Sequence, residues 1–480
     1  MPTTNSKTPA IPLRFILIFW LFLLSAIAFL DRTNISIAGS SISAEYHLGN
    51  IRLGWIFSSF LVGYASFQVV GGWLAGRVGP RRLLPLGILW WGIFTGLTAA
   101  VPARMRGALL ALMAIRFALG AGESFFYPTS NQFIARWIPA HERGKANGWI
   151  FAGVGAGSGL TPLLLTALIA RWGWRTSFWF SAVVGLIAAA VWYVIARDTP
   201  DEHPYISESE RETIRAGLHP VASREENRPG VQHPDKQTSP PQADSAPPIP
   251  WRSFFRSRDL LALTLSYFTF GYVAWVFFSW FNIYLKQARG LDLKTSAVYT
   301  MLPFLAMTVC CLIGGVLNDW MTHRYGLRVG RCALGFLALI ATAAFLAFGS
   351  TIHSAPVASF ILAGGAGALY FSQSSYWSVT VDLAGARSGI ASGIMNLGCQ
   401  IGAALTASLT PLVASKFGWT AAFMTAAALA VLGGVAWLLV DPRRTLVDST
   451  LPASQTEIDV QFHTAAQKRS QPVRARARDM

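Results

Sequence analysis

The sequence predicts an all-helical (all-α) membrane protein with twelve transmembrane helices in two pseudo-symmetric six-helix bundles. Three observations predict this fold. The apolar residues gather in runs of membrane length, a polar segment divides the runs into six and six, and the two sets carry similar motifs. Of the 480 residues, 53% are apolar and 13% are charged, whereas a soluble domain carries about 25% charged residues.

Each apolar run is long enough to cross the hydrocarbon core, which takes about 20 helical residues. Helices are expected because barrel strands would be about 10 residues long and would alternate in polarity. The expected spans are 13–35, 52–76, 82–101, 107–136, 145–170, 175–196, 259–285, 295–320, 329–350, 355–382, 386–413 and 418–440.

A polar segment separates the sixth run from the seventh. It contains a charged stretch from Glu208 to Arg215, expected to be helical, and is then rich in Pro, Gln and Ser, a composition typical of a linker. We therefore expect an N-terminal bundle at 1–196, a cytoplasmic linker at 197–258, a C-terminal bundle at 259–441 and a polar cytoplasmic tail at 442–480.

Similar motifs occur at corresponding places in the two sets of runs. The second run leads into Gly71-Gly72-Trp73-Leu74-Ala75-Gly76, and the eighth leads into Gly314-Gly315-Val316-Leu317-Asn318-Asp319. The fifth and eleventh runs each lead to a Gly-Trp pair, Gly173-Trp174 and Gly418-Trp419. Motifs paired in this way predict a duplicated six-helix unit.

The net charge of +16 comes from basic residues that collect in loops, in the linker and in the tails. No nucleic-acid-reading module accompanies them, so we expect no nucleic-acid partner. Short loops carry nearly equal numbers of Lys and Arg on the two sides, and the linker and tails then favour cytoplasmic termini. We expect a monomeric multi-pass protein of the inner membrane. The four cysteines lie in apolar runs without metal-like spacing, and no metal or cofactor is expected.

Four ionisable residues lie inside apolar, membrane-length runs: Asp31, Arg32, Arg116 and Glu123. Charges at bilayer depth are costly and usually mark a functional site. Arg116 and Glu123 are seven residues apart and share a helix face. Arginine stays charged and binds carboxylates through its planar fork, while a carboxyl group can carry a proton. The alternative is structural, with Asp31–Arg32 and Arg116–Glu123 as paired ions that fix helix packing.

Neutral polar residues inside the spans extend this candidate site. Tyr64 could donate a hydrogen bond to a ligand or pack at an interface. The tenth run carries Gln373, Ser375 and Trp377, and the eleventh carries Asn396. These groups suit a polyhydroxylated ligand, and the alternative is hydrogen bonding between helices.

The motif after the second run resembles the loop motif of the major facilitator superfamily, Gly-x-Leu-x-Asp-Arg-x-Gly-Arg-Arg/Lys. Gly76 stands at the acidic position, while the second copy keeps its acid as Asp319 and also carries Arg324. In that superfamily the acid helps to latch the two halves together, so the first latch is expected to differ here. The matching residues of the first copy are Gly72, Leu74, Arg77, Gly79, Arg81 and Arg82.

Within that superfamily the chain resembles the anion:cation symporter family over roughly residues 14–441. The first run carries Asp31-Arg32-Thr33-Asn34-Ile35-Ser36, and the fourth carries Arg116-Phe117-Ala118-Leu119-Gly120 followed by Gly122-Glu123, as family members do. The resemblance implies that Glu123, assisted by Asp31, handles the proton while Arg32 or Arg116 meets the carboxylate of the substrate.

The expected function is secondary active transport: proton-coupled uptake of an organic anion such as a hexonate, hexuronate or aldarate. The partners are then the anion, protons and the lipid bilayer. An anion exchanger or exporter, an aromatic-acid permease and a non-transporting membrane sensor remain as alternatives. No enzyme is expected, because the spans contain no His-Glu-x-x-His, no nucleotide loop and no Ser/His pair.

Overall fold

The computed structural model describes residues 11–48, 50–218, 251–291 and 293–446, and the regular structure of these residues is helical. The central part of the expected linker, 219–250, and the tail from 447 lie outside the described residues. The expected helix in the linker is confirmed as α8 (Glu208–Gly217), which begins where Ser207 accepts a hydrogen bond from the Glu210 amide.

The first half of the chain forms long helices whose bounds lie close to the expected spans. Short 3₁₀ turns, η1 (Ala140–Glu142) and η2 (Pro200–Glu202), precede α6 and α8. The long helices are α1 (Leu13–Glu45), α2 (Asn50–Val78), α3 (Pro80–Ala100), α4 (Ala108–Glu123), α5 (Phe126–Trp137), α6 (Arg143–Trp172) and α7 (Trp174–Ile195).

The second half repeats this plan with more interruptions. Its elements are α10 (Trp251–Arg256), α11 (Arg258–Trp275), the π-helical turn η3 (Val276–Trp280), α12 (Phe281–Gln287), α13 (Leu293–Tyr325), the π-helical turn η4 (Val329–Ala333), α14 (Leu334–Thr351), α15 (Ala355–Phe371), α16 (Gln373–Ala384), η5 (Gly385–Arg387) and α17 (Ser388–Trp437).

Among the described residues, ten segments are long and apolar enough to cross a membrane. The first nine each coincide with one expected span. The tenth, Ala355–Trp437, is 83 residues long and covers the last three expected spans. It is interrupted at η5 and at Gly418, so it is not one continuous helix.

The Gly-Trp motifs have the same backbone conformation in both halves. Gly173 has φ 81° and ψ 164°, and Gly418 has φ 85° and ψ 165°. Positive φ is accessible to glycine at little cost because glycine has no Cβ. Each glycine therefore ends one long helix and lets the next begin at its tryptophan.

The outer surface carries many exposed aliphatic side chains, as expected for a protein solvated by lipid. Leu110 is 70% exposed, Val194 69% and Leu305 63%. A soluble monomer rarely leaves so much apolar surface open.

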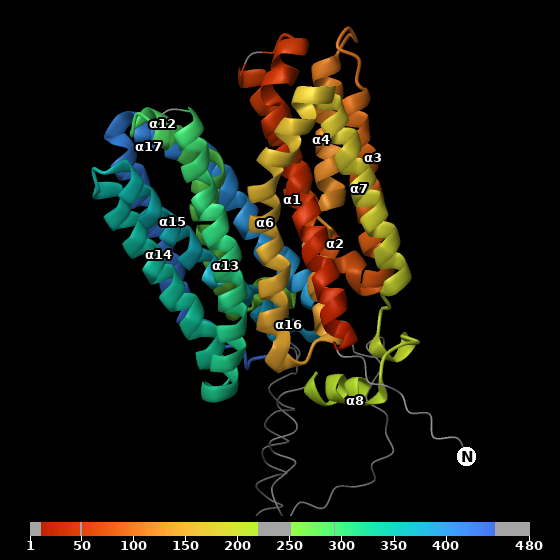
Figure 1. Ribbon diagram of the computed structural model, residues 1–480. Helices are drawn as coiled ribbons and strands as arrows, with labels where there is room; N and C mark the ends of the chain where they lie inside the picture. Colours follow the sequence, from red (N-terminus) through yellow and green to blue (C-terminus); the bar gives the residue numbers. More distant parts are fainter. Residues whose placement is uncertain (1–10, 49, 219–250, 292, 447–480) are drawn as a thin grey trace, which may run out of the picture.

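The helices form two groups, α1 to α7 and α11 to α17. Figure 1 shows that the groups lie close together at the end where α8 lies, which we call the linker side, and diverge toward the other end, near α12. α6 packs along α13, and α2 packs along α17. These two contacts are close because glycines meet there: a Cβ on Gly72 would stand 2.0 Å from the carbonyl oxygen of Gly389.

The helix α8 is fastened to the first group by a buried ion cluster. The guanidinium of Arg14 contacts Glu142 at 2.8 Å and Glu210 at 3.0 Å. Glu210 also accepts hydrogen bonds from the first amides of α1, those of Leu13 and Arg14. Ile214 is fully buried beneath the group. The start of the linker is therefore part of the first group.

Candidate functional site

The centre of the candidate site is an ion pair between Arg32 and Glu123. The Glu123 Oε1 atom accepts hydrogen bonds from Arg32 Nε at 3.1 Å and from Arg32 Nη2 at 2.5 Å. Glu123 is the last residue of α4 and lies midway along the span Ala108–Trp137. The pair joins α1 to α4 at mid-depth. The structural alternative paired Asp31 with Arg32 and Arg116 with Glu123, and the ion pair observed here joins Arg32 to Glu123 instead.

Aromatic rings surround the Arg32 guanidinium. Its Cζ atom lies 4.6 Å from the ring centroids of Phe29 and Tyr64 and 5.3 Å from that of Phe60. Rings at this distance attract the cation and hold its plane in place. The Arg32 side chain is 11% exposed, whereas that of Glu123 is 1% exposed. Arg32 is thus the more accessible member of the pair.

Arg116 and Asp31, the other two predicted charges, are buried next to this pair. Arg116 Cζ lies 4.9 Å from the ring of Phe60, so one ring contacts both guanidinium groups. Asp31 Oδ2 accepts a hydrogen bond from Thr95 at 2.6 Å. Within the described residues, Asp31 Oδ1 and Arg116 Nε and Nη1 have no hydrogen-bond partner. All four predicted charges are brought together, but Arg32 alone among them is partly open.

The predicted residues of α16 separate onto two faces. Gln373 Nε2 and Trp377 Nε1 both donate to the hydroxyl of Tyr267, at 2.8 and 3.0 Å. Ser375 points the other way and accepts a hydrogen bond from Asn318 at 2.8 Å. Residues two apart on a helix lie on nearly opposite faces. Gln373 and Trp377 therefore stay together, and Ser375 belongs to a different network.

Asn396 lies at the contact between the two groups. Its Nδ2 atom donates to Gln68 Oε1 at 3.0 Å, which joins α17 to α2. Both side chains are buried. This amide bridge lies on the linker side of Arg32 and joins the two groups there.

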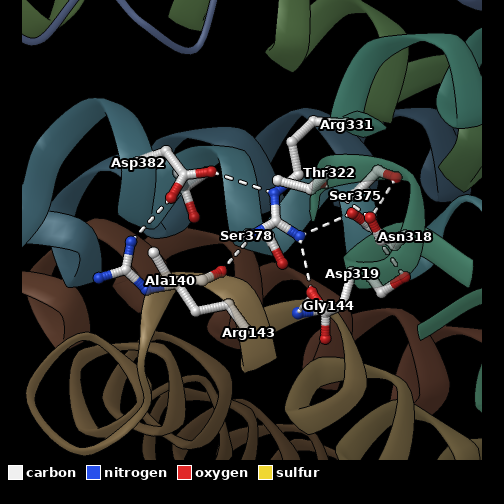
Figure 2. Close-up of polar contacts among 12 residues, drawn as sticks. Ala140, Arg143, Gly144, Asn318, Asp319, Thr322, Arg331, Ser375, Ser378 and Asp382 are labelled. Atoms are coloured by element: carbon white, nitrogen blue, oxygen red, sulfur yellow. Dashed lines mark hydrogen bonds and ion pairs between the residues drawn. The ribbon is translucent and has the colours of Figure 1, made fainter. Parts of the chain in front are cut away.

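A second cluster of charges, the linker-side network, joins the groups farther down. It consists of Arg143, Asp319, Arg331 and Asp382 (Figure 2). Arg143 of α6 contacts Asp382 of α16 at 2.7 Å. Arg331, fully buried, contacts Asp319 at 3.1 Å and Asp382 at 3.2 Å. The two cations and two anions thus compensate one another.

Asp319 also caps a helix of the other group. Its Oδ1 atom accepts a hydrogen bond from the Gly144 amide at 2.8 Å, and its Oδ2 atom accepts one from the Lys145 amide at 2.6 Å. These amides belong to the first turn of α6, where unpaired N–H groups and the helix dipole favour an anion. Arg331 Nη2 adds a hydrogen bond to the Ala140 carbonyl at 2.7 Å.

The corresponding contact of the first motif copy is neutral. A Cβ on Gly76 would meet nothing within 4 Å. The first turn of α17 is capped by Gln132, whose Oε1 atom accepts a hydrogen bond from the Gly389 amide at 3.1 Å. Gln132 Nε2 in turn donates to the Ala386 carbonyl. An amide therefore occupies the place that an acid would have taken.

The other predicted residues of the loop motif contact their own group. Arg77 Cζ lies 4.3 Å from the ring of Trp73. The Arg81 amide donates to Asp198 at 2.8 Å, next to Gly79, whose φ is 85°. Arg324, at the end of α13, contacts the ring of Tyr325. Of this set, Gly72 and Asp319 reach across the interface.

The sequence interpretation missed several members of these networks: Gln68, Gln132, Tyr267, Arg331 and Asp382. Gln68 had a usable signal, because it is a lone amide in an apolar run. Arg331 and Asp382 lie near the ends of their spans, where charges are common and carry little information.

Comparisons with known proteins agree with this architecture. The family model of the Major Facilitator Superfamily matches residues 21–407. A protein named as a probable sulfoacetate transporter of Cupriavidus necator is 33% identical over 88% of this chain and 92% of its own length. The hexuronate transporter of Bacillus subtilis is 26% identical over 87% of this chain and 92% of its own.

A solved structure of a proton:xylose symporter bound to 6-bromo-6-deoxy-D-glucose has a similar fold. It superposes with a TM-score of 0.68 at 17% identity and covers 90% of this chain and 98% of the other. The resemblance seen in the sequence motifs is confirmed. The chain belongs to the Major Facilitator Superfamily, whose members are membrane transporters and not enzymes.

Proposed function

We propose that this protein is a proton-coupled symporter that takes up an organic anion. The observation that carries the proposal is the Arg32–Glu123 ion pair, which places a ligand-accessible cation against a carboxyl group at mid-depth. Relatives named for sulfoacetate and hexuronate transport support an anionic substrate. Hexonates, hexuronates and aldarates are the candidate substrates.

The ion pair couples the two solutes by competition. A carboxylate that binds Arg32 must displace Glu123, which then loses its charged partner in an apolar setting. An uncompensated buried charge costs about 3–5 kcal/mol. Protonation of Glu123 removes that cost, so anion and proton bind together. Asp31 assists as a second proton site, and Arg116 compensates the charge of Asp31.

The arrangement around the site fits alternating access. The hydrogen bonds that join the groups lie on the linker side, so this conformation is closed there. We propose twelve crossings in two six-helix bundles, 1–196 and 259–441, with the linker 197–258 and the tail 442–480 in the cytoplasm of a monomeric inner-membrane protein. Rocking of one bundle against the other then exposes Arg32 to each side in turn.

The test is uptake by proteoliposomes that contain the purified protein, with and without an inward proton gradient. Glu123→Gln keeps the size and the hydrogen-bonding ability of the side chain but cannot titrate. We expect this variant to exchange internal for external anion, because exchange needs no net proton movement, and to lose accumulation driven by the gradient.

Asp31→Asn is the matched control for the assignment. If Glu123→Gln still concentrates the anion and Asp31→Asn does not, Asp31 is the main proton carrier. If the wild-type protein binds an anion but moves none of it, the protein is a sensor and the transport proposal is wrong.

A further inference from the structure

One buried amide next to the candidate site has no role so far. Gln400 of α17 is 7% exposed, and its Oε1 atom has no hydrogen-bond partner among the described residues. A buried polar atom without a partner costs about 1–3 kcal/mol. Such a group is completed by an ordered water or by a ligand, or else it lowers stability.

The position of Gln400 follows from the face of α17 that packs on α2. Gly389, Gly393, Asn396 and Gln400 are spaced by four, three and four residues and so share a face. A Cβ on Gly389 would meet Gly72, and a Cβ on Gly393 would stand 2.8 Å from the carbonyl oxygen of Gln68. Gln400 is one turn, about 6 Å, beyond Asn396 on this face.

The opposing helix runs the other way and places the arginine site at the same level. Along α2, Gln68 bridges to Asn396, and Tyr64 lies one turn farther from the linker side. The ring of Tyr64 lies 4.6 Å from Arg32 Cζ. Gln400, in the second group, therefore lies at the same depth as Arg32. It is one turn farther from the linker side than the Asn396–Gln68 bridge.

The charges of the two groups differ at this level. The first group supplies Arg32 and Arg116. The buried charged side chains of the second group, among the described residues, lie on the linker side instead: Asp259, Asp319, Arg331, Asp382 and Asp441. A substrate that reaches from Arg32 toward α17 meets amides, and a second anionic group would find no cation there.

We propose that Gln400 is a specificity-determining residue that accepts a hydrogen bond from a hydroxyl group at the uncharged end of the substrate. Gln373, whose Oε1 atom also has no partner in the described structure, adds a second acceptor on the same side. The proposal rests on the proposed function and deepens it: the preferred substrate is a hydroxylated monocarboxylate, not a dianion.

The test measures dissociation constants of the purified full-length protein for three six-carbon acids. Gluconate has one carboxylate and hydroxyls, hexanoate has one carboxylate and no hydroxyls, and galactarate has two carboxylates. We expect the wild-type protein to bind gluconate most tightly. Gln400→Leu should weaken gluconate binding about 3- to 10-fold, the loss of one hydrogen bond, and leave hexanoate binding unchanged. The control Ile401→Leu, at the lipid-exposed neighbour, should match the wild type.

Several results would overturn the inference. Gln400→Leu could weaken gluconate and hexanoate binding equally, which would indicate a packing defect, or weaken neither. Galactarate binding as tight as gluconate binding would also contradict it. If Arg32→Ala abolishes binding of all three acids while Gln400→Leu has no selective effect, the proposed function stands and this inference falls. If the wild-type protein binds none of the three, both fall.

Discussion

Replacing Asp319 by asparagine tests whether the linker-side network holds the two groups together. The carboxylate accepts two hydrogen bonds from amides of the other group, at 2.8 and 2.6 Å. A hydrogen bond to a charged group contributes about 1.5–3 kcal/mol, and a neutral one contributes about 1. Asparagine keeps one neutral acceptor, so the closed state should lose about 2–5 kcal/mol relative to the state open on the linker side. This is a shift of roughly 30- to 4,000-fold.

The assay is a distance measurement between spin labels on the linker side, one on each group, in a background without the native cysteines. Arg82 and Arg324 are exposed positions suited to the labels. Asp319→Asn should move the distribution toward longer distances. The control Asp201→Asn removes an equal charge from an exposed residue that pairs with Arg215 within the first group. An unchanged distribution in Asp319→Asn would refute the reasoning.

Two further predictions concern packing and pH. Gly72→Ala should slow anion exchange and lower stability by about 1–3 kcal/mol, because its Cβ would stand 2.0 Å from the Gly389 carbonyl oxygen. The control is Gly76→Ala, whose Cβ would meet nothing within 4 Å, and it should match the wild type in the same exchange assay. Hydrogen bonds from Arg175 lower the pKa of Glu45, so Glu45 stabilises the fold above a pH of about 4.3 and stops doing so as the pH falls through its folded-state pKa. Glu45→Gln should therefore lower the melting temperature at pH 7 and have little effect in acid; an equal effect at both pH values would contradict this.

The helices could be predicted from the sequence because run length and composition are local properties. The expected spans and the observed segments agree to within a few residues through Thr351. The break of the fourth span into α4 and α5 was not predicted, although Pro128 gave a signal for it. A proline cannot donate a hydrogen bond to the carbonyl four residues earlier, here that of Ser124, and the helix is interrupted at Ser124 and Phe125. The kink at Gly418 was predictable from its repeated Gly-Trp motif.

The site was predictable as a set of residues but not as a set of contacts. A charged residue is easily recognised within an apolar run, which is why Arg32 and Glu123 could be predicted as site residues. Their pairing joins residues 91 positions apart and depends on how α1 and α4 pack. The helical period places Ser375 on a face but cannot say which helix that face meets. For the same reason, the partner of Asn396 became known only from the packed structure.

The unequal caps at the linker side imply an order of events when that side opens. Gln132 holds the start of α17 with a neutral amide, whereas Asp319 holds the start of α6 with a full negative charge that Arg331 reinforces. The weaker contact, the one between Gln132 and the start of α17, should separate first. Opening then begins as a tilt about an axis near Asp319 and becomes a full separation when the charged corner yields. The molecule would thus pass through an asymmetric intermediate. In it, water has entered the interface between α2 and α17, while the interface between α6 and α13 is still packed.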